Sequence, residues 1–230
     1  MLILHQYPSI WGLSSLSPFC IKVETYLQMA SLPYKIVIQN NPGRGPKGKF
    51  PVLEDKGQLI ADSSFIVDYL NKHYSLSMAT SEPTALAMQR MIEEHLYFII
   101  LYSRWVDKAG VKKINTDFAQ FFPKPLASLA LSWIRKQLTK QAFMQGIARH
   151  SKEEVYALGI KDIEAIAAWL GNKDYCLGHA FKAINATVYA FMQTILLTPL
   201  ENPLKRALET QDNLVHYCQR IQHYLMMNRV

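Results

Sequence analysis

The sequence predicts an α/β part at the N-terminus and an all-helical part after it. In residues 1–77, short runs rich in β-branched and aliphatic residues alternate with amphipathic helical stretches and with turns rich in glycine and proline. From residue 82 onward the strand patterns stop, and apolar residues recur at the spacing of helices that bury one face. The polar residues 78–81 lie between the two patterns. We therefore expect two domains, 1–77 and 82–230, joined by a linker at 78–81.

The N-terminal part is expected to follow the order β-α-β, loop, β-β-α. The predicted elements are strands over 2–5 and 34–39, a hairpin of 52–54 and 58–60, a helix over 18–30, and a helix that begins at 62–64. Residues 40–48 are dense in turn formers, which disfavour a helix of any length there. This order of elements is that of a thioredoxin-like domain.

The C-terminal part is expected to be helical throughout. A long helix over 82–109 is predicted to end at Gly110. Ser151 and Glu154 have the spacing of a capping box, and Gly171 is expected to stop the helix that follows it. The remaining predicted helices cover 126–144, 182–197, 203–210 and 213–226.

The composition indicates an ordinary folded protein. Half of the residues are hydrophobic and 19% are charged, which excludes a disordered chain. The net charge is +7, with +2 in residues 1–78 and +5 in the rest. No basic motif interleaved with aromatic residues accompanies this charge, so we expect no nucleic-acid partner.

The cysteines and the apolar runs predict a reducing compartment and argue against a disulfide framework and a zinc site. Cys20, Cys176 and Cys218 are scattered and form no C-x-x-C pair, which argues for a reducing compartment and against a disulfide framework or a zinc site. The seven histidines have no metal-ligand spacing, so we expect no metal. The start of the chain lacks signal-peptide features, and no apolar run is long enough to span a bilayer. We expect a cytoplasmic protein without a membrane span.

The stretch Ser17-Pro18-Phe19-Cys20 is predicted to begin the first helix. Ser17 has the features of an N-cap, and Pro18 suits the first helical position. The unpaired N–H groups at such a start can bind an anion or lower the pKa of a thiol held against them. A serine–proline cap alone is more often structural than functional.

This stretch resembles the Cys-Pro-Tyr/Phe-Cys turn of glutaredoxins, with Ser17 in the place of the first cysteine, as in serine-type glutathione transferases. The run from Ser17 to Tyr34 looks like the branch of the glutathione transferase superfamily that contains failed-axon-connections and metaxin-like proteins. Further marks of that branch are found at 90–97 with Arg104-Trp105, at 146–154 and at 185–189. The resemblance therefore covers nearly the whole chain.

The resemblance implies a thioredoxin-like glutathione-binding domain followed by an all-helical glutathione transferase domain, assembled as a homodimer. Glutathione would be the co-substrate, and Ser17 the catalytic residue. Its hydroxyl would donate a hydrogen bond to the glutathione sulfur and favour the thiolate. The thiolate would attack a small hydrophobic electrophile or reduce a peroxide. No spacing suggests a His or Asp partner that would make Ser17 a nucleophile.

The resemblance also implies the residues that bind glutathione. They are Lys49, Phe50, Pro51, Val52, Asp62 and Ser63. Pro51 matches a cis-proline and removes an N–H, which leaves Val52 as an open edge for the cysteinyl unit. Asp62 and Ser63 match the pair that holds the γ-glutamyl end, and Lys49 stands where a lysine can hold the glycyl carboxylate. The purely structural alternatives are a loop proline at Pro51, a helix cap at Asp62 and Ser63, and a solvated surface lysine at Lys49.

The electrophile pocket is expected between the two domains. In the family, the loop after the first strand and the first helix of the second domain line this pocket. Here they offer Trp11, Tyr97, Tyr102 and Trp105. Aromatic residues at helical spacing are more often part of a core.

The sequence departs from the family pattern in two places. Residues 182–185 lack the hydroxyl and the carboxylate of the usual Thr-x-x-Asp box, which serves folding, so we expect a loss of stability of about 1 kcal/mol. The loop 40–48 is short for part of a glutathione site, which together with the absence of a reactive cysteine leaves other functions open. The first alternative is a non-catalytic binding or scaffold protein, as metaxin-like proteins are. The second is a glutaredoxin-like reductase, which would depend on Cys20 alone.

Overall fold

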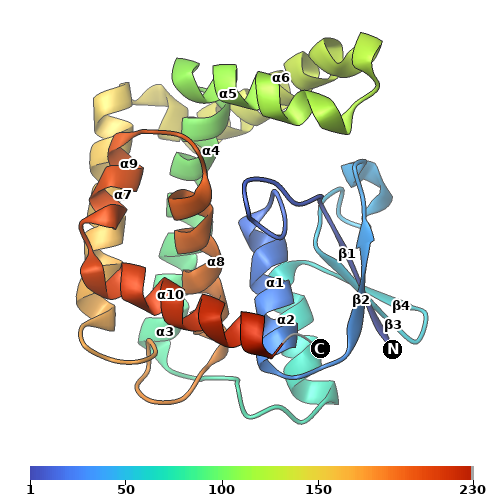
Figure 1. Ribbon diagram of the computed structural model, residues 1–230, viewed down its shortest axis with the longest axis vertical. Coiled ribbons are helices and arrows are strands. Elements are labelled where there is room, and N and C mark those ends of the chain that lie inside the picture. The colour runs from blue at the N-terminus through green and yellow to red at the C-terminus, as the bar shows by residue number, and fades with distance from the viewer. Residues whose placement is uncertain (229–230) are drawn as a thin grey trace.

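The computed structural model describes residues 1–228 and places all its strands in the first 61 residues (Figure 1). The strands are β1 (Leu2–Gln6), β2 (Tyr34–Ile38), β3 (Val52–Asp55) and β4 (Gln58–Ala61). They form one sheet in the order β2-β1-β3-β4, in which β1 and β2 are parallel and the other pairs antiparallel. Helices α1 (Pro18–Met29) and α2 (Ser63–His73) complete the predicted order of elements.

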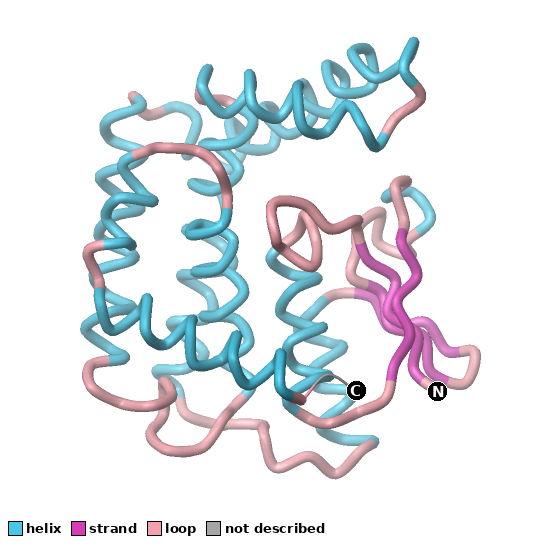
Figure 2. Tube along the Cα trace, viewed as in Figure 1, coloured by secondary structure: helices cyan, strands magenta, loops and turns pink. Residues whose placement is uncertain are grey.

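Both helices lie on the same side of this sheet. Figure 2 shows the strands at one border of the molecule, with the helices on one side of them. The loop from β2 to β3 holds only a short 3-10 turn, Pro42–Arg44, so no helix from this loop covers the other face. The expectation of no long helix in residues 40–48 is confirmed.

The rest of the described chain is helical, which confirms the predicted fold class. Its helices are α3 (Pro83–Arg90), a π-helical turn (Met91–Leu96), α4 (Tyr97–Trp105), α5 (Lys108–Phe118), α6 (Ala127–Gln145), α7 (Lys152–Leu170), α8 (Ala183–Leu197), α9 (Pro203–Glu209) and α10 (Asp212–Met227), with 3-10 turns at Ala119–Phe121, Lys124–Leu126 and Ile147–Arg149. Most bounds differ from the predicted ones by only one or two residues. The predicted capping box of α7 is present, with Ser151 and Glu154 bonded to each other's backbone.

The single long helix predicted over residues 82–109 is wrong. The helix ends at Trp105, and α5 begins at Lys108 with the carboxylate of Asp107 accepting a hydrogen bond from the N–H of Ala109 at 3.1 Å. Gly110 lies inside α5 and does not terminate a helix. A Cβ atom there would lie 1.8 Å from the carbonyl oxygen of Ser103, so only glycine allows α5 to pack this closely on α4.

Helix α1 connects the two parts of the fold because it packs on both. Its Val23, Tyr26 and Leu27 belong to a core with the strands and α2, whereas Ile21 belongs to the larger core of the helical part. Helix α8, which is buried along most of its length, is the main neighbour of α1. Within residues 1–228, no helix combines the length and the apolar character needed to cross a membrane.

No side chain caps the N–H groups at the start of α8, in line with the missing family box, but Asn185 in its first turn bonds the helix to its neighbours. The side chain of Asn185 is fully buried. It accepts hydrogen bonds from the N–H of Cys176 at 2.8 Å and from the hydroxyl of Tyr217 at 2.9 Å, and it donates to the carbonyl of Lys182.

Asn185→Ala would leave these buried polar groups without partners. We expect it to lower the free energy of unfolding by about 2–3 kcal/mol, measured by urea denaturation. Asn115→Ala, on the exposed side of α5, should change it by less than about 0.5 kcal/mol; equal effects would contradict this role of Asn185.

Candidate functional site

Ser17 ends the loop that leads into α1. Its backbone is extended (φ −106°, ψ 126°), and its carbonyl accepts a hydrogen bond from the N–H of Ile21, but its hydroxyl caps no backbone N–H. The hydroxyl lies beside the thiol of Cys20 instead. The hydroxyl of Ser15 accepts from the N–H of Ser17 at 3.4 Å and donates to the carbonyl of Tyr7 at 3.0 Å. The Ser15 hydroxyl therefore links the backbone of Ser17 to that of Tyr7.

Cys20 lies one turn into α1 and is fully buried, with Phe50 and Val52 packed against it. Burial raises the pKa of its thiol to about 11, although the backbone of Tyr7 and the hydroxyls of Ser15 and Ser17 lower it in part. The thiol is therefore protonated at neutral pH. This environment is that of a small apolar side chain and not of a nucleophile.

The segment from Phe50 to Val52 enters the sheet next to Cys20, and the Phe50–Pro51 peptide bond is cis. The expectation that Val52 forms an open edge is wrong. Val52 pairs with His5 of β1 on one side and with Ala61 of β4 on the other, because β3 is a central strand.

Tyr7 was missed by the sequence analysis. Its ring meets that of Phe50 edge-on at 5.4 Å, and its hydroxyl faces the backbone N–H of Phe50. Burial raises the pKa of Tyr7 well above its usual value, and the nearby Cys20 and Tyr97 add to this shift. A tyrosine directly after the first strand was the available signal, because the end of β1 lies beside the start of α1.

Asp62 and Ser63 begin α2, as predicted. The Asp62 backbone has φ +89°, an uncommon conformation for a residue other than glycine, and its carboxylate accepts a hydrogen bond from the N–H of Ser64 at 2.9 Å. Asp62 is exposed, whereas Ser63 is only 4% exposed. The hydroxyl of Ser63 accepts a hydrogen bond from the ammonium group of Lys22 at 3.3 Å, so its own proton remains free to donate.

Lys22 and Glu93 form a buried ion pair that the sequence analysis did not identify. The Lys22 Nζ atom lies 2.6 Å from Glu93 Oε1, and the side chains are 2% and 4% exposed. Gln89 and Thr187 donate further hydrogen bonds to the Glu93 carboxylate. The pair therefore ties α1 to the π-helical turn and α8, while Ser63 ties it to α2. The only sequence signal was a lysine inside the otherwise apolar start of α1.

Arg104 of α4 is a second buried cation near Ser17. It is 6% exposed and donates hydrogen bonds to the carbonyl of Leu16 and to the hydroxyl of Thr198, both at 3.0 Å. It forms no ion pair within residues 1–228. Burial lowers its pKa to about 10, which still leaves it charged at neutral pH. Its positive charge therefore lies next to the residue that precedes Ser17.

The four aromatic residues predicted for the electrophile pocket do not share one wall. Trp11 and Trp105 both pack against Phe118, with ring centroids 5.4 and 5.8 Å apart. Tyr97 contacts Phe19 of α1 at 5.0 Å, and Tyr102 faces Tyr156 of α7. Tyr102 thus lies against α7, apart from the aromatic contacts of the other three.

Lys49 is exposed and makes no hydrogen bond or ion pair within the described residues. Its ammonium group is free to meet a ligand carboxylate. In residues 1–228 no group of three or more His, Cys, Asp and Glu side chains is arranged to hold a metal ion.

Comparison with known proteins identifies relatives along nearly the whole chain. An isoprene-epoxide–glutathione S-transferase from Rhodococcus sp. (strain AD45) is 30% identical over 96% of this chain and 98% of its own length. Failed axon connections from Drosophila melanogaster is 29% identical over 96% of this chain, which spans only 57% of that protein. Human metaxin-2 is 26% identical over 89% of this chain and 81% of its own length.

Solved structures share the fold at low sequence identity. Glutathione transferase GSTFuA3 from Phanerochaete chrysosporium has a TM-score of 0.70 at 14% identity, over 97% of this chain and 96% of its own. A glutathione S-transferase of Ceriporiopsis subvermispora in complex with glutathione has a TM-score of 0.61 at 19% identity, over 97% of both chains.

Two family models match successive parts of the sequence. The glutathione S-transferase N-terminal domain matches residues 18–110, and the glutathione S-transferase C-terminal domain matches residues 159–221. Together with a relative that is 30% identical over nearly its full length, these matches show that the chain belongs to the glutathione S-transferase superfamily, in the branch that includes metaxins and Failed axon connections.

Proposed function

We propose that this protein binds glutathione as a co-substrate and transfers its sulfur to a small hydrophobic electrophile or uses it to reduce a peroxide. One observation carries this proposal: the start of α1, the Phe50–Val52 segment and the start of α2 meet around Cys20 and Lys22. Three segments that the resemblance assigns to glutathione, far apart in sequence, thus converge beside one helix N-terminus. Helix N-termini favour bound anions such as carboxylates and thiolates.

Ser17 is the proposed catalytic residue. Its hydroxyl would turn from Cys20 to the glutathione sulfur and donate a hydrogen bond that stabilises the thiolate. The charge of Arg104, held at Leu16, would favour the thiolate as well. With an epoxide, the new S–C bond would form as a C–O bond breaks, and the alkoxide would take a proton from water. The Rhodococcus relative is named for an isoprene epoxide, which supports a small epoxide as one electrophile.

Peroxide reduction would use the same thiolate. Its sulfur would attack a peroxide oxygen, the O–O bond would break, and an alcohol would leave. A second glutathione would then form the disulfide and release water, so two thiols are oxidised for each peroxide reduced. We propose that Trp11 and Trp105, which share Phe118 as a neighbour, line the electrophile side, with Tyr97 nearer to α1.

The protein would bind the rest of glutathione through the charged groups at its two ends and through its cysteinyl unit. Asp62 would accept the α-ammonium group, while the hydroxyl of Ser63 would donate to the neighbouring carboxylate. Lys49 is free to pair with the glycyl carboxylate. The cysteinyl unit would lie along Phe50 and Pro51, ahead of the paired residue Val52.

A non-catalytic binding protein is the second candidate, and one feature of the site favours it. Two groups assigned to glutathione already have partners within the protein: the Ser17 hydroxyl lies at Cys20, and the Phe50 N–H faces Tyr7. Glutathione would have to compete with these contacts. The similarity to metaxins agrees with this candidate.

Calorimetric titration of glutathione tests the binding step. We expect a dissociation constant at or below about 1 mM for the wild type and at least about tenfold weaker binding for Ser63→Ala. Ser64→Ala is the matched control, because Ser64 touches Lys22 as well but is not assigned to glutathione. Absence of heat and of thermal stabilisation at about 10 mM glutathione would favour the binding protein without glutathione chemistry.

We also propose the homodimer and the two domains, 1–77 and 82–230, that the family resemblance implies. Leu129, Trp133 and Met144 are 68%, 62% and 67% exposed and recur along one face of α6, which supports an apolar contact between subunits. The cytoplasmic location stays a prediction from the sequence.

A further inference from the structure

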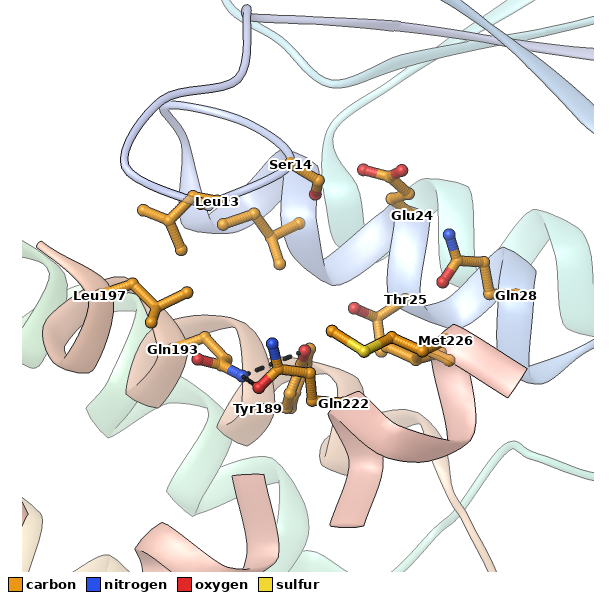
Figure 3. Close-up of a pocket in the computed structure, with 13 residues that line it drawn as sticks. Leu13, Ser14, Glu24, Thr25, Gln28, Tyr189, Gln193, Leu197, Gln222 and Met226 are labelled. Carbon is orange, nitrogen blue, oxygen red and sulfur yellow. Dashed lines mark hydrogen bonds between the residues drawn. The ribbon is translucent and has the colours of Figure 1, made fainter. Parts of the chain in front are cut away.

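A cavity of about 120 Å³ lies between α1, α8, α10 and the loop at Gly12–Ser14 (Figure 3). None of the residues proposed for glutathione or for the electrophile lines it. On α1 it is bordered by Ile21, Glu24, Thr25 and Gln28, whereas Lys22 of the same helix faces α2 and Glu93. The cavity is therefore distinct from the site proposed above.

Glu24 brings a buried carboxylate to one wall of this cavity. Its side chain is only 7% exposed, and its oxygens accept hydrogen bonds from the amide of Gln6 at 3.2 Å and from the hydroxyl of Tyr34 at 3.4 Å. Within the described residues, Glu24 forms no ion pair. Among the other buried carboxylates, Glu93 and Asp107 each have a lysine within 2.8 Å and Asp162 a histidine at 2.6 Å, while Asp55 accepts from two tyrosine hydroxyls. A buried carboxylate without a cation favours a positively charged ligand.

The opposite wall carries neutral polar groups. Gln193, which is 4% exposed, donates from its amide nitrogen to the hydroxyl of Tyr189 and to the amide oxygen of Gln222, both at 3.2 Å. The amide oxygen of Gln193 and the amide nitrogen of Gln222 have no partner within residues 1–228. Figure 3 shows Gln193, Gln222 and Tyr189 across the cavity from Glu24. This wall can both donate and accept hydrogen bonds.

Apolar side chains lie between the two walls. Leu13, Ile21, Leu197 and Leu225 line the cavity with the polar residues. A cavity of about 150 Å³ holds a benzene molecule, so this one suits a ligand of about six non-hydrogen atoms. We propose that the cavity binds a small alkylammonium compound, with the ammonium group on Glu24, the short alkyl chain on these apolar residues, and a hydroxyl or amino group at Gln193 and Gln222.

Titration of the full chain with four probes of similar size tests this proposal. 4-Amino-1-butanol has both polar ends, pentylamine lacks the far hydroxyl, 1,4-butanediol lacks the charge, and 4-hydroxybutyrate reverses it. We expect 4-amino-1-butanol to bind with a dissociation constant below about 10 mM and 1,4-butanediol at least about tenfold more weakly. No binding of 4-amino-1-butanol at about 50 mM, or equal binding of the amine and the diol, would overturn the proposal.

Two variants locate the ligand. Glu24→Gln should abolish the preference for 4-amino-1-butanol over the diol. Glu164→Gln, the same change at an exposed position without a hydrogen bond or ion pair in residues 1–228, should keep it. Gln222→Leu on α10 should lower the affinity for 4-amino-1-butanol to that for pentylamine, and it should leave the affinity for pentylamine unchanged. The thermal midpoint of Glu24→Gln shows whether this variant folds. If it does not, Gln222→Leu alone tests the cavity, and an unchanged affinity of Gln222→Leu for 4-amino-1-butanol rejects the proposal. The titrations need no glutathione, so their outcome is independent of the proposed transferase activity.

Discussion

Lys22→Ala is expected to lower the free energy of unfolding by about 3–5 kcal/mol, because it leaves the carboxylate of Glu93 buried without its cation. The loss should be large because Lys22 also donates to Ser63 and Ser64, so both α2 and the π-helical turn lose a partner on α1. For a chain of this length, such a loss corresponds to a decrease of about 6–20 °C in the thermal midpoint. Thermal unfolding followed by circular dichroism measures it.

Two further variants distinguish the loss of a buried ion pair from the loss of a surface ion pair. Lys113→Ala removes a partly exposed partner of Asp117 at 3.1 Å and should cost less than about 1 kcal/mol. The double variant Lys22→Met, Glu93→Leu removes both buried charges and should recover most of the stability lost in Lys22→Ala. If the double variant is no more stable than Lys22→Ala, the unpaired carboxylate is not the cause of the loss.

Ser17→Ala is expected to lower kcat/KM for glutathione transfer by about 10²-fold, since it removes the hydrogen-bond donor proposed for the thiolate. The pKa of the bound glutathione thiol should rise, because the lost hydrogen bond favoured its charged form. A rise of one pH unit corresponds to about 1.4 kcal/mol. Thiolate absorbance near 240 nm, followed against pH in the complex, gives this pKa directly; a merely structural role of Ser17 would leave it unchanged.

Three controls accompany Ser17→Ala. Ser17→Thr keeps a hydroxyl and should retain more activity than the alanine variant. Ser9→Ala changes an exposed serine of the same loop and should match the wild type. Cys20→Ala should retain the transferase activity, since the Cys20 thiol is buried and protonated; loss of activity there together with full activity of Ser17→Ala would favour the glutaredoxin-like reductase.

Local signals in the sequence predicted most of the secondary structure. Ser151 and Glu154 cap α7, and Asp62 caps α2. The start of α1 was found from Ser17-Pro18, although the Ser17 hydroxyl caps no backbone N–H. The helix predicted over 82–109 was wrong because apolar spacing continues across the turn at Asp107. The turn depends on α5 folding back onto α4, where Gly110 meets the carbonyl of Ser103.

The sequence by itself determined the class of the fold, the starts of the helices and the residues placed at those starts. These features depend on spacing and capping within a few residues. The tertiary structure alone decided which groups face the residues at these helix starts. Lys22 bonds to Glu93, which lies 71 positions away in the sequence, and Arg104 bonds to Leu16, which lies 88 positions away. It also decided that Val52 is paired on both sides and that Glu24 borders a cavity. Such contacts depend on how the helices pack around α1, which local spacing does not encode.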